Sequence, residues 1–133
     1  MTDAELIAAA GRVITDRPNG SYRAGGVGAA LLTAGGHLHL GVCIDTDCSL
    51  EFCAEANAIG AMVTAGESRI ARIVAVWRGE GGVPRVVPPC GRCREFIHQI
   101  DPGNLATRVI LPGGKVVTLA DLLPHHDGFA FLE

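Results

Sequence analysis

The stretch from Ile70 to Trp77 limits the fold more than any other part of the sequence. It is apolar and rich in β-branched residues, which is typical of a central strand buried on both faces. Helical patterns flank it at 53–65, which is rich in Ala, Ile and Met, and at 91–100. A strand buried on both faces needs helices on both sides of its sheet. The sequence therefore predicts an α/β fold.

The other segments extend this prediction. We expect further strands at 27–33, 37–44, 106–111 and 115–118, and further helices at 3–15 and 119–123. In the strand at 37–44, His37 and His39 alternate with leucines and are expected on its polar face. The Gly- and Pro-rich stretch 79–89 is expected to be irregular. A hairpin followed by crossover units implies a mixed sheet, and 133 residues suit one domain over 1–133.

Composition and charge narrow the class of protein. Hydrophobic residues make up 48% of the chain, which argues against disorder. The net charge is −3 and no run of Lys or Arg occurs, so a nucleic-acid partner is disfavoured and a small-molecule partner fits better. We see no signal peptide and no apolar stretch near the ~20 residues that a membrane-spanning helix needs. The sequence therefore predicts a cytoplasmic protein without a membrane partner.

The five cysteines indicate metal binding or catalysis, because an odd number in a cytoplasmic protein does not suit a disulfide framework. Cys90 and Cys93 are three apart at the start of a predicted helix, so both thiols can face one ion. Cys53 begins another predicted helix. We expect the two helix N-termini to lower the pKa values of these thiols and favour thiolates. Three thiolates suit tetrahedral zinc and leave the fourth position for water, as in catalytic zinc sites.

Glu55 follows Cys53 by two positions and is the candidate catalytic residue. Residues two apart do not face each other in the middle of a helix, so the pair works only if Cys53 lies at the helix start. Glu55 can then reach the water rather than the metal and act as a general acid–base. Three thiolates leave a net charge of −1 on the zinc site. Arg92 is the preferred residue for charge compensation, with Arg94 as the alternative.

Two motifs, Cys53-Ala54-Glu55 and Pro89-Cys90-Gly91-Arg92-Cys93, resemble those of the zinc-dependent cytidine deaminase family. The Cys-Ala-Glu form is similar to the homotetrameric branch that acts on free nucleosides. Within that branch, residues 89–94, 101–103, 122–124 and 128–129 are most similar to the blasticidin S deaminases. The resemblance implies a three-layer α/β/α sandwich with a five-stranded mixed sheet. It also implies a homotetramer, or a homodimer, whose active sites draw on more than one subunit.

The resemblance implies a reaction and a set of substrate contacts. The reaction is hydrolytic deamination of cytidine or deoxycytidine to the uracil nucleoside and ammonia, with Zn²⁺ as cofactor and Glu55 as proton shuttle. The backbone near Ala54 and Pro89 would hold the amino group and the ring. Cys43 and Asp45 fall where the family's Asn-x-Glu holds the ribose, and Phe129 falls among C-terminal aromatics that close over the ligand. The resemblance leaves pyrimidine salvage and detoxification open as roles.

Three alternatives accompany this reading. The substrate could be a modified cytosine nucleoside such as blasticidin S, because Cys43 and Asp45 depart from the family's sugar-binding residues. A non-catalytic zinc-stabilised binding module would need a fourth protein ligand, for which His125 or His126 is the candidate. A nucleic-acid deaminase would need a basic groove, which the acidic composition does not favour.

Overall fold

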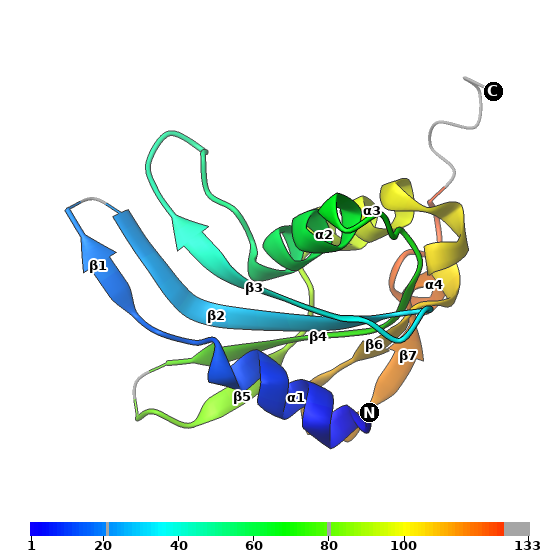
Figure 1. Ribbon diagram of the computed structural model, residues 1–133, viewed down its shortest axis with the longest axis horizontal. Helices are drawn as coiled ribbons and strands as arrows, with labels where there is room; N and C mark the ends of the chain where they lie inside the picture. Colours follow the sequence, from blue (N-terminus) through cyan, green and yellow to red (C-terminus); the bar gives the residue numbers. More distant parts are fainter. Residues whose placement is uncertain (21, 80, 127–133) are drawn as a thin grey trace.

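The computed structural model describes residues 1–20, 22–79 and 81–126. A twisted sheet forms the middle layer, with α1 on one face and α2 and α3 on the other (Figure 1). The elements in chain order are α1 (Asp3–Arg12), β1 (Arg17–Asn19), β2 (Tyr22–Thr33), β3 (Leu38–Asp45), α2 (Ala54–Thr64), β4 (Ile70–Arg78), β5 (Pro84–Val87), α3 (Gly91–Ile100), β6 (Arg108–Ile110), β7 (Val116–Thr118) and α4 (Leu119–Leu122). Short 3-10 helices cover Pro102–Ala106 and Pro112–Gly114. The predicted α/β/α sandwich is confirmed.

The sheet is mixed, as expected, but the described residues form seven strands in it rather than the five expected. Five strands lie side by side in the order β3, β2, β4, β6, β7, and only the β4–β6 pair among them is parallel. The two unpredicted strands, β1 and β5, are short. β1 pairs with the first residues of β2, and β5 pairs with the last residues of β4. They extend the sheet at the end where β4 finishes.

The alternation of side chains along the strands produces two hydrophobic clusters, one on each face of the sheet. On β2, Ala29 and Leu31 pack toward α2, while Ala30 packs toward α1. On β4, Ile73 and Val74 divide in the same way, and both are buried. Period-2 alternation between two covered faces explains why the central strands are apolar throughout.

Helix α1 covers one face of the sheet through the predicted apolar stripe. Leu6, Ala10 and Ile14 are buried there, and Ile7 packs against the same cluster. A capping box between Thr2 and Glu5 begins the helix. The helix ends at Arg12, earlier than predicted, and the following chain turns to pair with the sheet.

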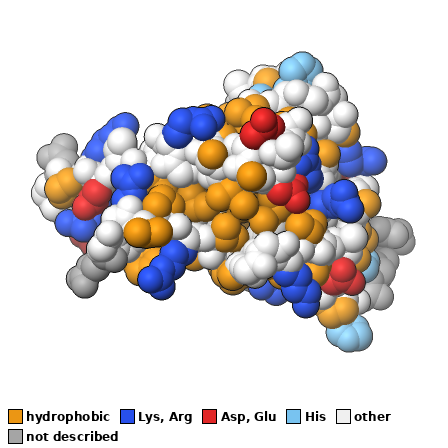
Figure 2. All heavy atoms as spheres, turned by 90° about the horizontal axis from the view of Figure 1, so that it is seen from below, with side chains coloured by type: hydrophobic (Ala, Val, Ile, Leu, Met, Phe, Trp, Pro, Cys, Tyr) orange, Lys and Arg blue, Asp and Glu red, His pale blue; other side chains and the backbone are white. Residues whose placement is uncertain are grey.

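The face that carries α1 is shown in Figure 2. An apolar band crosses the middle of this face, and Lys and Arg side chains lie around it with Asp and Glu among them. Positive charge on this face is therefore interspersed with negative charge. Of the helices that the structure describes, none is both long enough and apolar enough to cross a membrane.

Helix α2 lies unusually close to β3, and Gly41 makes this approach possible. A Cβ atom on Gly41 would lie 2.4 Å from Ala58 N and 2.5 Å from Ala54 O, so a side chain there has no room. The Asn57 amide adds a link by donating to Val42 O at 2.7 Å. These contacts fix the position of α2, and with it the residues at the start of that helix.

Candidate metal and catalytic site

Three cysteine thiols meet where α2 and α3 begin. The Sγ atoms of Cys53, Cys90 and Cys93 all lie within 4.8 Å of one another. Cys53 and Cys90 are the N-cap residues of α2 and α3, and Cys93 lies in the first turn of α3. Among the described residues, this is the group of His, Cys, Asp and Glu side chains close enough together to hold a metal ion. The structure thus brings together the three predicted ligands.

The backbone at both N-caps explains how the thiols come to face one another. Cys53 and Cys90 have extended φ and ψ angles, so each side chain leaves its helix before the helical geometry is established. Within the described part of the chain, neither thiol makes a capping hydrogen bond to its own helix. Both side chains are therefore directed to the shared site.

The prediction that the helix N-termini lower the thiol pKa values is right for Cys90 and wrong for the other two. Burial raises the pKa of Cys90, but hydrogen bonds from the Cys93 backbone and from both neighbouring thiols bring it below its ordinary value. Burial raises the pKa of Cys53. Burial, followed by the Glu55 charge, raises the pKa of Cys93. Desolvation therefore outweighs the helix dipole at the two more enclosed thiols.

The chemistry of this donor set fits zinc. Three clustered thiols cannot all ionise easily while their negative charges face one another. A divalent cation offsets that repulsion and stabilises the thiolates. Three sulfur ligands match the preference of Zn²⁺, and three protein ligands rather than four are typical of a catalytic zinc site.

Glu55 lies beside the thiols in the first turn of α2. Its side chain is buried, with 6% of the residue exposed. Burial raises the pKa of Glu55, and hydrogen bonds from its own backbone N–H and the Cys93 thiol offset this only in part. Because Cys53 is the N-cap, the carboxyl group can share a pocket with Cys53 despite the spacing of two. The condition set by the sequence is met.

A pocket of about 260 Å³ opens over the site. Five of the predicted residues line it together with the ligands Cys53 and Cys90: Cys43, Asp45, Ala54, Glu55 and Arg92. Sequence reasoning missed other lining residues, among them Val27, Glu51, Phe52, Val87 and Pro88. Phe52 could have been found from its position next to Cys53, whereas Val27 and Val87 reach the pocket only through strand pairing.

Cys43 and Asp45 share one wall of this pocket at the end of β3. The Cys43 thiol accepts a hydrogen bond from Val27 N at 3.3 Å and donates to Asp45 Oδ2 at 3.7 Å. Cys43 is buried, while Asp45 is exposed. The thiol is thus engaged within the wall, and the Asp45 carboxylate is the polar group presented to a ligand.

Pro89 lies behind the site instead of in the metal pocket. It is buried and lines a small cavity together with Glu55, Ile73 and Val109. Its carbonyl accepts a hydrogen bond from Arg94 Nε at 2.9 Å. The preceding Pro88 lines the metal pocket in its place. Phe129, the predicted C-terminal aromatic, lies outside the described residues.

The two candidate arginines have different surroundings. Arg92 lines the metal pocket, donates to Glu51 O at 3.3 Å and lies 5.9 Å from the centre of the Phe52 ring. Arg94 is half-buried and donates to the Pro89 and Leu122 carbonyls. Arg92 therefore bridges the pocket rim to α3, and Arg94 fixes the segment that leads into Cys90.

The site agrees with comparisons to known proteins. Residues 2–108 match the family model of the "Cytidine and deoxycytidylate deaminase zinc-binding region". A blasticidin-S deaminase from Bacillus cereus is 37% identical over 105 residues, which are 74% of each chain. A cytidine deaminase from Proteus mirabilis (strain HI4320) is 31% identical over 111 residues, which are 77% of this chain and 32% of that protein.

Solved structures with a similar fold are also cytidine deaminases. The crystal structure of cytidine deaminase from Mycobacterium leprae superposes with a TM-score of 0.74 at 27% sequence identity. The match covers 94% of this chain and 99% of the other. Both the sheet and the helices that carry the thiols therefore belong to a recurring architecture.

Proposed function

Because the chain belongs to the cytidine and deoxycytidylate deaminase family, a family of zinc-dependent hydrolytic deaminases, we propose that it deaminates a free cytosine nucleoside, cytidine or deoxycytidine. Water replaces the 4-amino group, and the products are the uracil nucleoside and ammonia. The observation that carries this proposal is the buried Glu55 carboxyl group in the same pocket as the Cys53 and Cys90 thiols. A proton carrier beside a metal-binding cluster is what hydrolytic deamination requires.

The described side chains have separate roles in this reaction. Cys53, Cys90 and Cys93 would hold the zinc ion through their thiolates. When bound, zinc supplies the Lewis acidity that activates water for nucleophilic attack. Glu55 takes one proton from the attacking water and delivers it to N3 of the ring as oxygen adds to C4. Glu55 then carries the second proton to the amino group, so that ammonia leaves and C4 keeps the oxygen.

The pocket walls would orient the nucleoside. The Asp45 carboxylate, exposed at the end of β3, accepts a hydrogen bond from a sugar hydroxyl. The ring lies against Ala54, which lines the pocket beside Glu55. Arg92 at the rim compensates part of the negative charge of the thiolate cluster. Each role follows from where the residue borders the pocket and from the chemistry of its side chain.

A second candidate substrate is a modified cytosine nucleoside such as blasticidin S. One observation favours it: the relative named blasticidin-S deaminase is 37% identical and matches 74% of this chain. The chemistry at C4 would be the same. The difference would lie on the sugar side of the pocket, where Cys43 and Asp45 form the wall.

We further propose that the protein works as a homotetramer. A groove of about 480 Å³ lies between α2 and α3, and its lining includes Phe52 and Phe96, which are 49% and 36% exposed. Phe52 and Arg92 line both this groove and the metal pocket, so a second copy seated in the groove would reach the edge of the active site. Sedimentation equilibrium of the zinc-loaded protein measures the assembly, and a monomer at all concentrations would contradict it.

The proposed reaction is tested directly with a substrate panel. Zinc-loaded protein is incubated with cytidine, deoxycytidine and blasticidin S, and the change in ultraviolet absorbance follows loss of the 4-amino group. Turnover of cytidine or deoxycytidine supports the first candidate, and turnover of blasticidin S alone supports the second. If none of the three is deaminated, the proposed function is wrong.

A further inference from the structure

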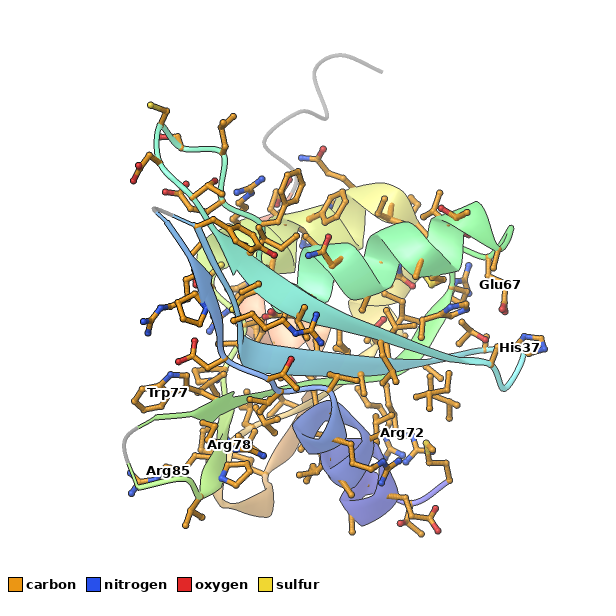
Figure 3. All side chains as sticks on the ribbon, turned by 60° about the vertical axis from the view of Figure 1, so that its left-hand side comes forward. His37, Glu67, Arg72, Trp77, Arg78 and Arg85 are labelled. Carbon is orange, nitrogen blue, oxygen red and sulfur yellow. The ribbon has the colours of Figure 1, made fainter. Side chains whose placement is uncertain are left out.

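The strand β3 lies at an edge of the sheet and carries part of the wall of the metal pocket. It starts beside His37 and runs to the opposite end of the sheet, between β2 and helix α2 (Figure 3). Among the strands that the structure describes, only β2 pairs with β3. Cys43 and Asp45, near the end of β3, line the pocket that also holds Glu55. The position of this wall therefore depends on what holds the side of β3 away from β2.

The pairing of β3 with β2 is interrupted at Cys43. The register passes from Ala24–Ile44 directly to Gly28–Val42, so three residues of β2 stand opposite one residue of β3. Such a bulge disrupts the regular ladder of hydrogen bonds locally. The strand β2 thus supports the wall least at the point where Cys43 lines the pocket.

Two contacts hold the outer side of β3 on either side of Cys43. Ile44 exchanges two backbone hydrogen bonds of 2.9 Å with Phe52, which precedes α2. The side-chain amide of Asn57, from within α2, donates to Val42 O at 2.7 Å. Residues two apart in a strand direct their backbone polar groups to the same side, so both contacts lie on the side of β3 away from β2. Asn57 therefore gives Val42 the partner that a neighbouring strand would supply.

Helix α2 places Asn57 for this contact. The Asn57 backbone N–H donates to Cys53 O at 3.2 Å, so Asn57 lies one turn after that thiol ligand. Asparagine is a poorer helix former than Ala56 and Ala58, which flank it. The helix alone does not account for an asparagine at this position, whereas the hydrogen bond to Val42 O does.

We propose that Asn57 is a positioning residue for the substrate, because its amide holds β3 at Val42 and so fixes the wall that presents Asp45. The proposal rests on the deaminase function proposed above and names a determinant of its substrate affinity. Asn57 is not among the described residues that line the metal pocket, so it acts through β3. The close contact at Gly41 holds the start of α2 separately. Loss of the amide should therefore loosen the wall and leave Glu55 in place.

The test measures steady-state deamination of cytidine by zinc-loaded wild type, Asn57→Ala and Asn57→Asp, with blasticidin S as substrate if the panel above identifies it. Alanine removes the hydrogen-bond donor. Aspartate keeps the size of the side chain, but its carboxylate cannot donate to Val42 O. In both variants we expect KM to rise roughly 3- to 10-fold through loss of one hydrogen bond, while kcat changes less than about twofold. Metal analysis should show zinc at the wild-type ratio.

Gln99→Ala is the matched control. Gln99 lines the same groove between α2 and α3 as Asn57, but its amide donates to Glu95 on its own helix. An effect that arises from the groove rather than from β3 would appear in this variant too. We expect Gln99→Ala to leave KM unchanged.

Hydrogen–deuterium exchange gives a second reading that does not depend on activity. Residues 40–46 should exchange faster in Asn57→Ala than in wild type, because the edge of β3 opens more often without the contact at Val42. Residues 91–100 in α3 should exchange as in wild type.

The outcomes separate this inference from the proposed function. A rise in KM alone, with faster exchange over 40–46, supports the inference. An unchanged KM, a loss of kcat together with zinc, an equal rise of KM in Gln99→Ala, or unchanged exchange over 40–46 overturns the inference while the deaminase function stands. If wild type deaminates neither cytidine, deoxycytidine nor blasticidin S, both are wrong.

Discussion

The Sγ atoms of Cys53 and Cys90 lie 3.9 Å apart. The two residues are the N-caps of different helices, and the strands β4 and β5 separate these helices in the sequence. This contact brings two helix starts to one point and makes the metal centre a junction between α2 and α3. Replacing either cysteine, or Cys93, by serine should abolish retention of zinc, because serine is a poor zinc ligand and the remaining two thiols cannot fill the site. Metal analysis of the dialysed protein measures the loss.

Cys48 provides the matched control for these cysteine variants. It is exposed in the loop after β3 and lies outside the thiol cluster. Cys48→Ser should therefore retain zinc at the wild-type ratio. Loss of zinc in this control, or full retention in Cys93→Ser, would contradict the assignment of the ligands.

Glu55→Gln should retain zinc and lose activity, because the amide keeps the shape of the side chain but cannot carry a proton. We expect kcat to fall by about 10²–10⁴-fold, the usual contribution of general acid–base catalysis. Glu51→Gln is the control, since Glu51 lines the same pocket but is exposed at its rim. Steady-state kinetics together with metal analysis measure both. A fully active Glu55→Gln enzyme would exclude this residue as the proton carrier.

Gly41→Ala should reduce both stability and activity. The added Cβ would meet Ala58 N at 2.4 Å and push α2, with Cys53 and Glu55, away from β3. Overpacking of this kind costs roughly 1–3 kcal/mol of unfolding free energy. Gly60→Ala on α2 itself is the control, because a Cβ there meets nothing within 4 Å and alanine favours the helix. Urea unfolding should rank the two variants on opposite sides of wild type.

Asp101 should make folding stability depend on acid pH. The Gly103 backbone N–H, followed by the Arg69 and Ser68 side chains, holds the pKa of Asp101 below its ordinary value. A carboxyl group with a lowered folded-state pKa stabilises the protein above its unfolded-state pKa and loses this contribution as the pH falls through the folded-state value. Asp101→Asn should therefore lower Tm at neutral pH, and its difference from wild type should shrink in acid. Thermal unfolding from pH 7 to pH 3, with Asp47→Asn as control, measures this. A gap that stayed constant over that range would exclude the charge as the cause.

Much of the fold could be predicted because its signals are local. The helix predicted over 91–100 has the observed bounds of α3, and the apolar run at 70–77 forms the central strand β4. The strands β1 and β5 were missed because Pro18 and Pro84 are typical turn residues. Both strands exist only through their pairing with β2 and β4, which no local pattern contains.

The expected polar face of β3 was wrong for a related reason. Leu38 and Leu40 are 36% and 37% exposed, whereas only 15% of the His39 side chain is exposed. Helix α2 covers the face that carries Gly41 and Cys43, and alternation puts His39 on the same face. Which face of an edge strand is covered depends on where a helix from elsewhere in the chain packs, so hydropathy alone gave the opposite answer.

The thiols and Glu55 could be predicted because they fall in two short motifs at helix starts. The hollow of about 540 Å³ beside the metal pocket could not, because its lining residues Arg23, Asp45 and Trp77 come together only when β2 pairs with β3 and β4. The position of the proposed catalytic group is thus encoded by local spacing, and the wall that contains Asp45 is formed by tertiary contacts.

The close packing of α2 against Gly41 has a consequence for evolution. The helix that presents Cys53 and Glu55 packs directly against the backbone at Gly41, so a mutation that shifts the helix would move the Cys53 thiol and the Glu55 carboxyl group together. The ends of β3 and β4 are not constrained in this way, because Asp45 and Arg78 are exposed there and line an open hollow. Side chains at the strand ends can therefore be exchanged in evolution while the helix start with Cys53 and Glu55 stays in place.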